Sequence, residues 1–303
     1  MPRASGPLAE ALRRGSVLLD GGLSNQLAAQ GCDLSGDLWT GRVLDERPDQ
    51  VEAAHTAYAR AGAQVLITAS YQVDPRHPRA AALLRRSVDL AARAAETADH
   101  EVWVAASVGP YGAVLADGSE YRGRYGLSMR RLADFHRPRI EALLAAGPDV
   151  LALETVPDPD EAEALLTVLA ETGAPAWLSY TVADGRTRSG DPLPAAFARA
   201  ARSEQIIALG VNCCDPAEVL PALEAAAATT RKPLLAYPND GSVWNAGTRT
   251  WRTPDHPAPW PTRAWRTAGA RLVGGCCRIG PDRITALAAE LPRTGDVADD
   301  QSS

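Results

Sequence analysis

The chain has 303 residues, of which 46% are hydrophobic and 22% are charged, as in ordinary soluble globular proteins. Its formal net charge of -6 at pH 7 excludes the strongly basic surface that nucleic-acid-binding proteins use. We therefore expect small-molecule partners and no nucleic acid.

Two features of the sequence bear on the cellular compartment of the protein: its lack of targeting signals and its small number of cysteines. The first twenty residues contain no secretory signal, and no apolar run is long enough to cross a bilayer, so we expect a cytoplasmic protein without membrane contact. Five cysteines in so long a chain do not fit a secreted disulfide framework. Metal binding and catalysis are the roles that this leaves open for them.

Short apolar segments and helix-like segments alternate along the chain. The apolar segments are residues 16–22, 63–70, 101–107, 149–155, 174–182, 205–212, 232–238 and 270–275. Segments with apolar residues three and four apart, typical of amphipathic helices, lie between most of them, at 47–63, 78–98, 128–147 and 159–174. Such alternation predicts an α/β fold with a parallel sheet buried on both faces.

Eight units of this kind predict a (β/α)8 barrel of the TIM type, in which the active site lies at the C-terminal ends of the strands. No composition shift divides the chain, so we expect one barrel domain over residues 1–290. Residues 291–303 are predicted to be a short, polar, disordered tail. The Pro- and Trp-rich residues 250–265 are expected to be irregular.

Three cysteines follow two of the predicted strands. Cys213 ends the sixth strand, and Cys276 with Cys277 ends the eighth. Zinc prefers four tetrahedral ligands and binds thiolates well, so three converging cysteines would leave one position open for chemistry. Adjacent cysteines can reach one metal only where the backbone is bent, which we expect Gly274 and Gly275 to permit. The sequence therefore predicts a zinc site at the C-terminal rim of the barrel.

Seven segments together resemble the homocysteine S-methyltransferases, and within them the branch that uses S-methylmethionine. They are LLDGGLSNQLAAQG, AGAQVLITASYQ, ASVGPYGAVLADGSEYRG, LALETVPDPDEAEAL, LGVNCC, AYPNDG and LVGGCC. The resemblance extends from about residue 16 to about residue 290. It implies a zinc-containing (β/α)8 barrel, in agreement with the strands counted above, and it implies Cys213, Cys276 and Cys277 as the Zn²⁺ ligands.

The resemblance also implies a binding site for homocysteine. Asp20 and Glu154 match the carboxylates that hold its amino group, and Thr68 matches a polar position near the same substrate. Gly21 would give backbone access beside Asp20. The neighbouring Cys214 has no assigned role.

The implied reaction is transfer of a methyl group from a sulfonium donor to the zinc-activated thiolate of homocysteine, which gives methionine. S-methylmethionine is the favoured donor, and S-adenosylmethionine fits the same chemistry. Gln72 stands where the betaine-using branch has a tyrosine, which argues against betaine. Trp39, Tyr71 and Trp244 follow strand ends and are candidates for contact with the donor's positive charge.

The sequence is also compatible with other functions. The alternatives are a zinc-dependent methyltransferase for another thiol or selenol, and a barrel with a structural, non-catalytic zinc. Monomeric and dimeric states both fit the sequence. Asp158, Asp160 and Glu161 are predicted to occupy the first turn of a helix without a chemical role, and the five histidines to be surface or packing residues.

Overall fold

The structure is a computed structural model that describes residues 4–34, 40–245, 248, 250–253, 255 and 258–291. The predicted tail, apart from Leu291, lies outside the described residues, as do Trp39 and His256. No helix in the described part of the chain is long and apolar enough to cross a membrane.

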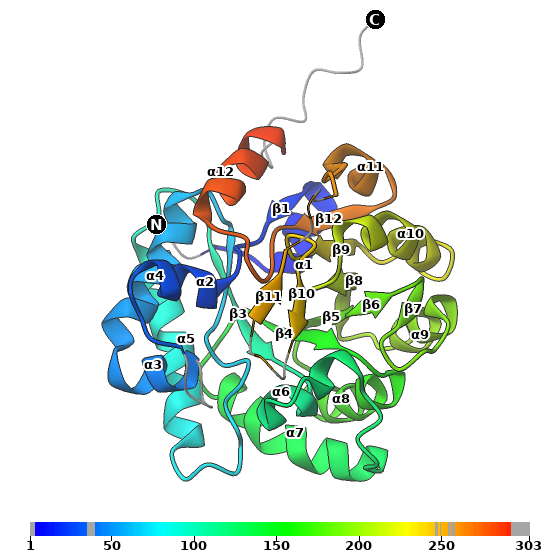
Figure 1. Cartoon of the computed structure of the whole chain (residues 1–303), viewed down its shortest axis with the longest axis horizontal. Helices are drawn as coiled ribbons and strands as arrows, with labels where there is room; N and C mark the ends of the chain where they lie inside the picture. Colours follow the sequence, from blue (N-terminus) through cyan, green and yellow to red (C-terminus); the bar gives the residue numbers. More distant parts are fainter. Residues whose placement is uncertain are drawn as a thin grey trace, which may run out of the picture.

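Eight parallel strands form the central sheet of the described chain (Figure 1). They are β1 (Val17–Leu18), β2 (Val65–Ile67), β3 (Trp103–Val108), β4 (Val150–Val156), β5 (Ala176–Tyr180), β8 (Ile206–Asn212), β9 (Leu234–Tyr237) and β12 (Ala270–Val273). Each strand coincides with one of the predicted apolar segments, and β3 and β4 extend one residue beyond theirs. Their order in the sheet is β1-β12-β9-β8-β5-β4-β3-β2, and a parallel bridge between Leu19 and Val65 joins the two ends. The prediction of a (β/α)8 barrel is confirmed.

Helices surround the barrel (Figure 1). In chain order they are α1 (Leu8–Arg14), α2 (Leu23–Ala29), α3 (Thr40–Glu46), α4 (Pro48–Arg60), α5 (Ala80–Glu96), α6 (Tyr111–Leu115), the 3-10 turn η1 (Ser119–Tyr121), α7 (Met129–Leu144), α8 (Pro159–Thr172), α9 (Leu193–Ala200), α10 (Pro216–Ala227), α11 (Thr262–Thr267) and α12 (Pro281–Glu290). The four helical segments predicted from periodicity correspond to α4, α5, α7 and α8.

The start of α8 shows how local sequence sets a helix boundary. Asp158 is the N-cap, its side chain accepts a hydrogen bond from the Asp160 N–H, and Pro159 takes the first helical position. Glu161, also in the first turn, is fully buried and accepts hydrogen bonds from the Tyr125 hydroxyl and the Tyr111 N–H. Asp160 and Glu161 thus lie in the first turn, as predicted, whereas Asp158 precedes that turn as its cap.

Two hydrophobic layers hold the barrel together. Alternate strand residues such as Trp103, Ala105 and Trp177 point into the barrel, where α1 contributes Leu8 and Leu12 to the same cluster. The remaining strand residues pack outward against the surrounding helices in a larger cluster. This alternation follows from the two-residue period of a strand, and it leaves the C-terminal strand ends free for polar groups.

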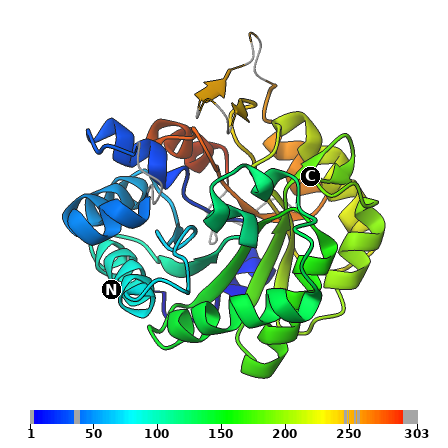
Figure 2. The same ribbon diagram turned by 60° about the horizontal axis from the view of Figure 1, so that its bottom comes forward.

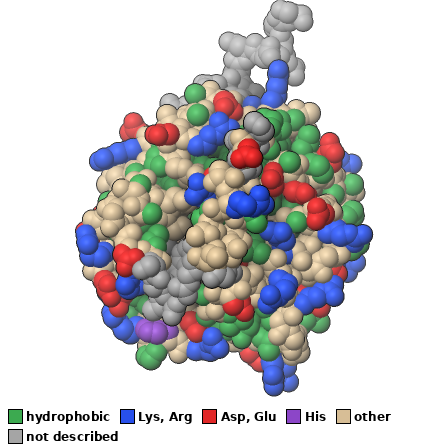
Figure 3. Space-filling view, in the orientation of Figure 1, with side chains coloured by type: hydrophobic (Ala, Val, Ile, Leu, Met, Phe, Trp, Pro, Cys, Tyr) green, Lys and Arg blue, Asp and Glu red, His purple; other side chains and the backbone are tan. Residues whose placement is uncertain are grey.

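Two short hairpins interrupt the βα pattern. β6 (Val182–Ala183) pairs with β7 (Arg186–Thr187), and β10 (Val243–Asn245) pairs with β11 (Thr250–Arg252). Figure 2 shows the second hairpin projecting from the barrel. The expectation of an irregular segment at 250–265 was incomplete, because β11 and the first residues of α11 lie within it. Basic and acidic side chains are interspersed over the face seen in Figure 3.

Candidate active site

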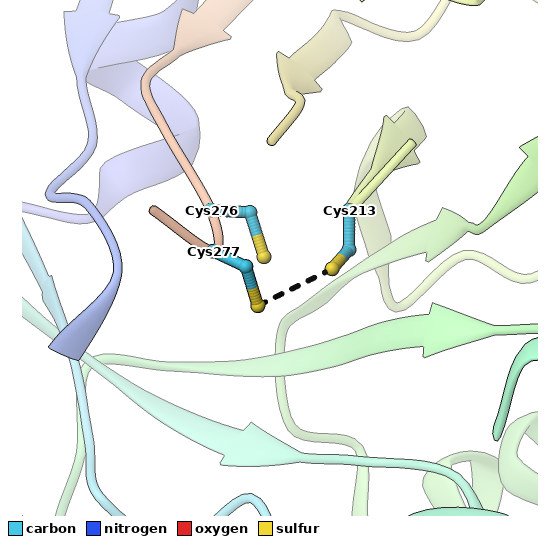
Figure 4. A group of neighbouring side chains, drawn as sticks. All are labelled: Cys213, Cys276 and Cys277. Atoms are coloured by element: carbon cyan, nitrogen blue, oxygen red, sulfur yellow. Dashed lines mark hydrogen bonds between the residues drawn. The ribbon is translucent and has the colours of Figure 1, made fainter. Parts of the chain in front are cut away.

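Three cysteines from two strand ends meet at the C-terminal rim. Cys213 follows β8, and Cys276 with Cys277 follows β12. Their sulfur atoms all lie within 4.8 Å of one another, and Sγ of Cys213 is 3.5 Å from Sγ of Cys277. Figure 4 shows the three side chains turned toward one another. The predicted convergence of these thiols is confirmed.

The spacing of the sulfurs suits one zinc ion. Four sulfurs at about 2.3 Å from a tetrahedral zinc lie about 3.8 Å apart, and the three thiols need move little to satisfy this geometry. An all-thiol donor set is one that zinc favours, and three such donors leave a fourth position for a ligand.

Close packing explains the two glycines before Cys276. Neither Gly274 nor Gly275 has a positive φ, so the freedom to bend that we expected is not what the site uses. A Cβ on Gly274 would lie 2.5 Å from Cβ of Leu19, and one on Gly275 would lie 2.2 Å from Cγ2 of Ile279. The segment that carries the cysteines therefore lies against β1 and folds back on itself, in a way that only glycine permits.

Two residues at the strand ends beside the cysteine group have strained backbone conformations. Cys213 has φ 48° and Thr155 has φ 58°, in the left-handed region that a β-branched residue such as threonine rarely adopts. Asn212 holds this geometry: its Oδ1 accepts from the Thr155 N–H at 2.7 Å, and its Nδ2 donates to the Thr155 hydroxyl at 2.8 Å. Asn212 stands in the quoted GVNC segment, but no role was predicted for it.

A pocket of about 160 Å³ opens beside the thiols. Its lining includes the predicted residues Gly21, Thr68, Glu154, Cys213, Cys276 and Cys277, the aromatic residues Tyr71, Tyr121, Tyr237, Trp244 and Trp251, and also Gln72 and Glu120. The pocket therefore places potential metal ligands, a carboxylate and aromatic rings around one space.

Glu154 is held in place by two hydroxyl groups. The Ser107 hydroxyl donates to Oε1, and the Tyr237 hydroxyl donates to Oε2 at 3.1 Å. Burial raises the pKa of Glu154 to about 7, against the opposing effect of these hydrogen bonds. A carboxylate kept so far from water binds a cationic group strongly.

Asp20 lies deeper than predicted. Its Oδ2 accepts a hydrogen bond from the Ile67 N–H at 2.8 Å, and its buried Oδ1 has no hydrogen-bond partner among the described residues. Burial, and then the charge of Glu154, raises the pKa of Asp20 well above its ordinary value. Asp20 is not among the residues that line the pocket, whereas its neighbour Gly21 is.

Thr68 connects two strand ends. Its Oγ1 accepts from the Ser107 N–H at 3.0 Å and lies 2.7 Å from Oγ of Ser70. Thr68 is 3% exposed and lines the pocket beside the predicted substrate residues.

Comparison with known proteins places the chain in a family. The family model described as homocysteine S-methyltransferase matches residues 17–291. The chain belongs to the homocysteine S-methyltransferase family. It is therefore an enzyme of the methyltransferase class, and the resemblance seen in its sequence motifs is confirmed.

Individual relatives match over nearly their whole length. The homocysteine S-methyltransferase of Escherichia coli strain K12 is 44% identical over 292 residues, which cover 90% of this chain and 94% of the relative. A homocysteine S-methyltransferase of Bacillus subtilis strain 168 is 41% identical over 296 residues, covering 90% and 93%. The crystal structure of the Escherichia coli homocysteine methyltransferase MmuM in its metallated form superimposes with a TM-score of 0.83 at 42% identity, covering 94% of this chain and 100% of that one.

In this member of the family, the three thiols differ in acidity. Hydrogen bonds from Cys276 and Cys277 lower the pKa of Cys213 well below its ordinary value, and the same contacts with Cys213 raise the pKa of the other two. The Tyr121 hydroxyl, 3.2 Å from Sγ of Cys213, adds to the lowering. Cys213 is thus the most acidic of the three thiols.

Cysteines outside the trio have other surroundings. Cys214 is buried in the hydrophobic cluster between barrel and helices, where burial raises its thiol pKa. Cys32 is half-buried, packed against the same cluster, and is not part of the cysteine group.

Several residues in or beside the pocket carried no predicted role. Tyr237 lines the pocket, and Ser107 and Asn212 lie behind it and hold lining residues; all three stand at strand ends, to which the barrel rule already pointed. Tyr121 and Glu120 belong to η1, in the loop after β3, where no local pattern distinguishes them from surface residues. Of the aromatic candidates, Tyr71 and Trp244 line the pocket.

Proposed function

We propose that the enzyme transfers a methyl group from a sulfonium donor, S-methylmethionine, to the thiolate of homocysteine and forms methionine. Membership of the family supports homocysteine as the acceptor. The observation that carries the proposal is that Cys213, Cys276 and Cys277 meet in the pocket that Glu154 lines. We also propose that residues 1–290 act as one barrel domain with only small-molecule substrates.

Cys213, Cys276 and Cys277 are the proposed ligands of a zinc ion. Bound there, zinc supplies a positive centre at which a substrate sulfur is held as thiolate near neutral pH, where a free thiol with a pKa of about 8.5 is mostly protonated.

The polar residues of the pocket orient homocysteine. Glu154, positioned by Ser107 and Tyr237, binds its ammonium group. Asp20 adds negative charge close to Glu154, and Thr68 offers a hydroxyl at the same strand ends. With Gly21 these residues hold the amino-acid end of the substrate, so that its sulfur extends toward the three cysteines.

The donor enters with its sulfonium toward the substrate sulfur. The bond between methyl carbon and donor sulfur breaks, and its electron pair stays on that sulfur, which becomes a neutral thioether. A pair from homocysteine sulfur forms the new bond. With S-methylmethionine, both products are methionine.

The test is a donor comparison on zinc-loaded, reduced protein. Homocysteine is offered separately with S-methylmethionine, S-adenosylmethionine and betaine, and methionine is measured. We expect the highest rate with S-methylmethionine and no reaction with betaine. Absence of methionine with every donor, with zinc bound, would overturn the proposal in favour of another thiol or selenol acceptor, or of a structural zinc.

Two neighbouring cysteines provide a matched pair of variants. Cys213→Ala should lose bound zinc and activity, because it removes one of three sulfur donors. Cys214→Ala should retain both, because Cys214 lies in the hydrophobic cluster. Equal zinc content in the two variants would contradict the ligand assignment.

A further inference from the structure

The pocket contains a carboxylate that no step above uses. Glu120 lies in η1 and lines the pocket together with Cys213 and Glu154. Its Oε2 is buried and has no hydrogen-bond partner among the described residues. Removing a carboxylate oxygen from water without a partner costs free energy, so this position gains most from a cationic ligand.

The protein compensates this charge only in part. Burial, with smaller contributions from the charges of Cys213 and Asp117, raises the pKa of Glu120 to about 7, against the effect of a hydrogen bond from its own backbone N–H. Arg122 lowers it, but the side chain of Arg122 is exposed. Glu154, by contrast, receives two hydroxyl hydrogen bonds.

Aromatic rings line the same pocket as Glu120. Tyr71 and Tyr121 line it, and the charge of Glu120 contributes to the raised pKa of Tyr71. Trp244 and Trp251, from the β10–β11 hairpin, also line it, with ring centroids 5.2 Å apart. Aromatic faces attract cations, and a nearby carboxylate strengthens the same preference.

We propose that Glu120 is the counter-ion of the donor's sulfonium and makes this pocket select a cationic methyl donor. The inference rests on the proposed function. The reaction brings three cationic groups to this site, the ammonium of homocysteine and both the sulfonium and the ammonium of S-methylmethionine. The pocket has two carboxylates in its lining, Glu154 and Glu120. Glu154 is already assigned to the ammonium of homocysteine, and Glu120 lines the pocket together with Cys213, beside which the sulfonium must lie for transfer.

The charge balance of the reaction predicts which kinetic constant Glu120 controls. Before transfer, the donor sulfur is positive and the acceptor sulfur is negative, and after transfer both are neutral. The attraction of Glu120 for the donor is therefore strongest in the bound substrate and weaker in the transition state. Such an interaction lowers the KM for the donor without raising kcat.

The experiment compares Glu120→Gln with the unchanged protein in steady-state kinetics. The KM for S-methylmethionine should rise about 10- to 100-fold, kcat should not fall, and the KM for homocysteine should stay within about threefold. Glu120→Asp, which keeps the charge, should recover most of the donor affinity. Zinc content and denaturant unfolding of each variant establish that the fold is kept.

Asp117→Asn is the matched control. Asp117 is an exposed acid in the same loop, and its Oδ1 accepts from the Ser119 N–H, a contact that asparagine retains. Asp117 does not line this pocket but lines the adjoining cavity, so the variant removes a nearby negative charge and should leave both KM values within about threefold. A rise in donor KM equal to that of Glu120→Gln would mean that only general electrostatic attraction is at work, and would overturn the proposal.

A second measurement distinguishes recognition of the donor's sulfonium charge from recognition of its amino-acid group. Tetramethylammonium carries a sulfonium-like cation without an amino-acid group, and should compete with S-methylmethionine in the unchanged protein but about tenfold more weakly in Glu120→Gln. An unchanged donor KM, or a rise in the homocysteine KM alone, would refute the assignment. If the unchanged protein makes no methionine from any donor, the proposed function itself fails, which this experiment distinguishes from failure of the Glu120 assignment.

Discussion

A methyl group at Gly275 tests the geometry of the cysteine segment directly. The Cβ of Gly275→Ala would lie 2.2 Å from Cγ2, 2.5 Å from Cβ and 2.9 Å from Cγ1 of Ile279. Carbon atoms pack at about 3.5 to 4.0 Å, so the overlap is about 1 Å or more. The Cβ of Ile279 is fixed to its backbone, and rotation of that side chain therefore cannot relieve the clash.

The backbone between residues 275 and 279 must move instead. Overpacking of this kind costs about 1 to 3 kcal/mol of unfolding free energy. Cys276 and Cys277 lie within the displaced segment, so the loss extends to metal binding. Displaced ligand geometry should weaken zinc binding by about 10- to 100-fold, the range found when the groups that orient metal ligands are removed.

Gly280→Ala is the control from the same segment. A Cβ on Gly280 meets no atom within 4 Å, so this variant adds the same methyl group without a clash. Urea unfolding of the metal-free proteins measures the stability, and competition with a chromophoric chelator measures zinc affinity. If Gly275→Ala matched Gly280→Ala in both assays, the close packing of this segment would be refuted.

Three further predictions concern the polar groups. Glu154→Gln should raise the KM for homocysteine at least about 30-fold, because it removes the proposed partner of a desolvated ammonium. The pKa of Glu154 is raised to about 7, so protonation of Glu154 should also raise this KM in the unchanged protein as pH falls below 7. A KM that does not depend on pH would contradict the role. Asn212→Ala should reduce the unfolding free energy by about 2 kcal/mol, because it leaves the Thr155 N–H unpaired, and a urea midpoint equal to that of the unchanged protein would argue against this clamp. Burial lowers the pKa of His55 to about 4. The neutral His55 therefore contributes fully to stability above pH 6.5, and up to about 3 kcal/mol of unfolding free energy is lost as pH falls toward 4. In urea unfolding, His55→Gln should reduce this loss of stability at acid pH, whereas His77→Gln, at an exposed position, should not.

The barrel was predictable because its signals are local. Each strand is a short apolar run and each long helix repeats apolar residues three and four apart, so the period of the pattern distinguishes the two without knowledge of contacts. The rule that active sites lie at C-terminal strand ends then made Cys213, Cys276 and Cys277 neighbours. The same rule pointed to Glu154.

The tertiary structure decided the contacts between segments far apart in the chain. Ser107 and Tyr237 reach Glu154 across 47 and 83 residues, and nothing in their neighbouring sequence marks these contacts. The packing of Gly275 against Ile279 depends on the path of a single loop, and its reason is contact rather than backbone freedom.

Glu120 shows most clearly the difference between what the sequence determines and what the tertiary structure determines. In the sequence it is one acid in a polar loop, and such residues are usually exposed. Its significance comes from burial of one oxygen in a pocket that the segments after β8 and β12 and the β10–β11 hairpin also line. The sequence by itself determined the barrel and the group of thiols, because strand periodicity and strand-end position are local properties. Only the tertiary structure decided which charges lack a partner, because burial is a property of the whole fold.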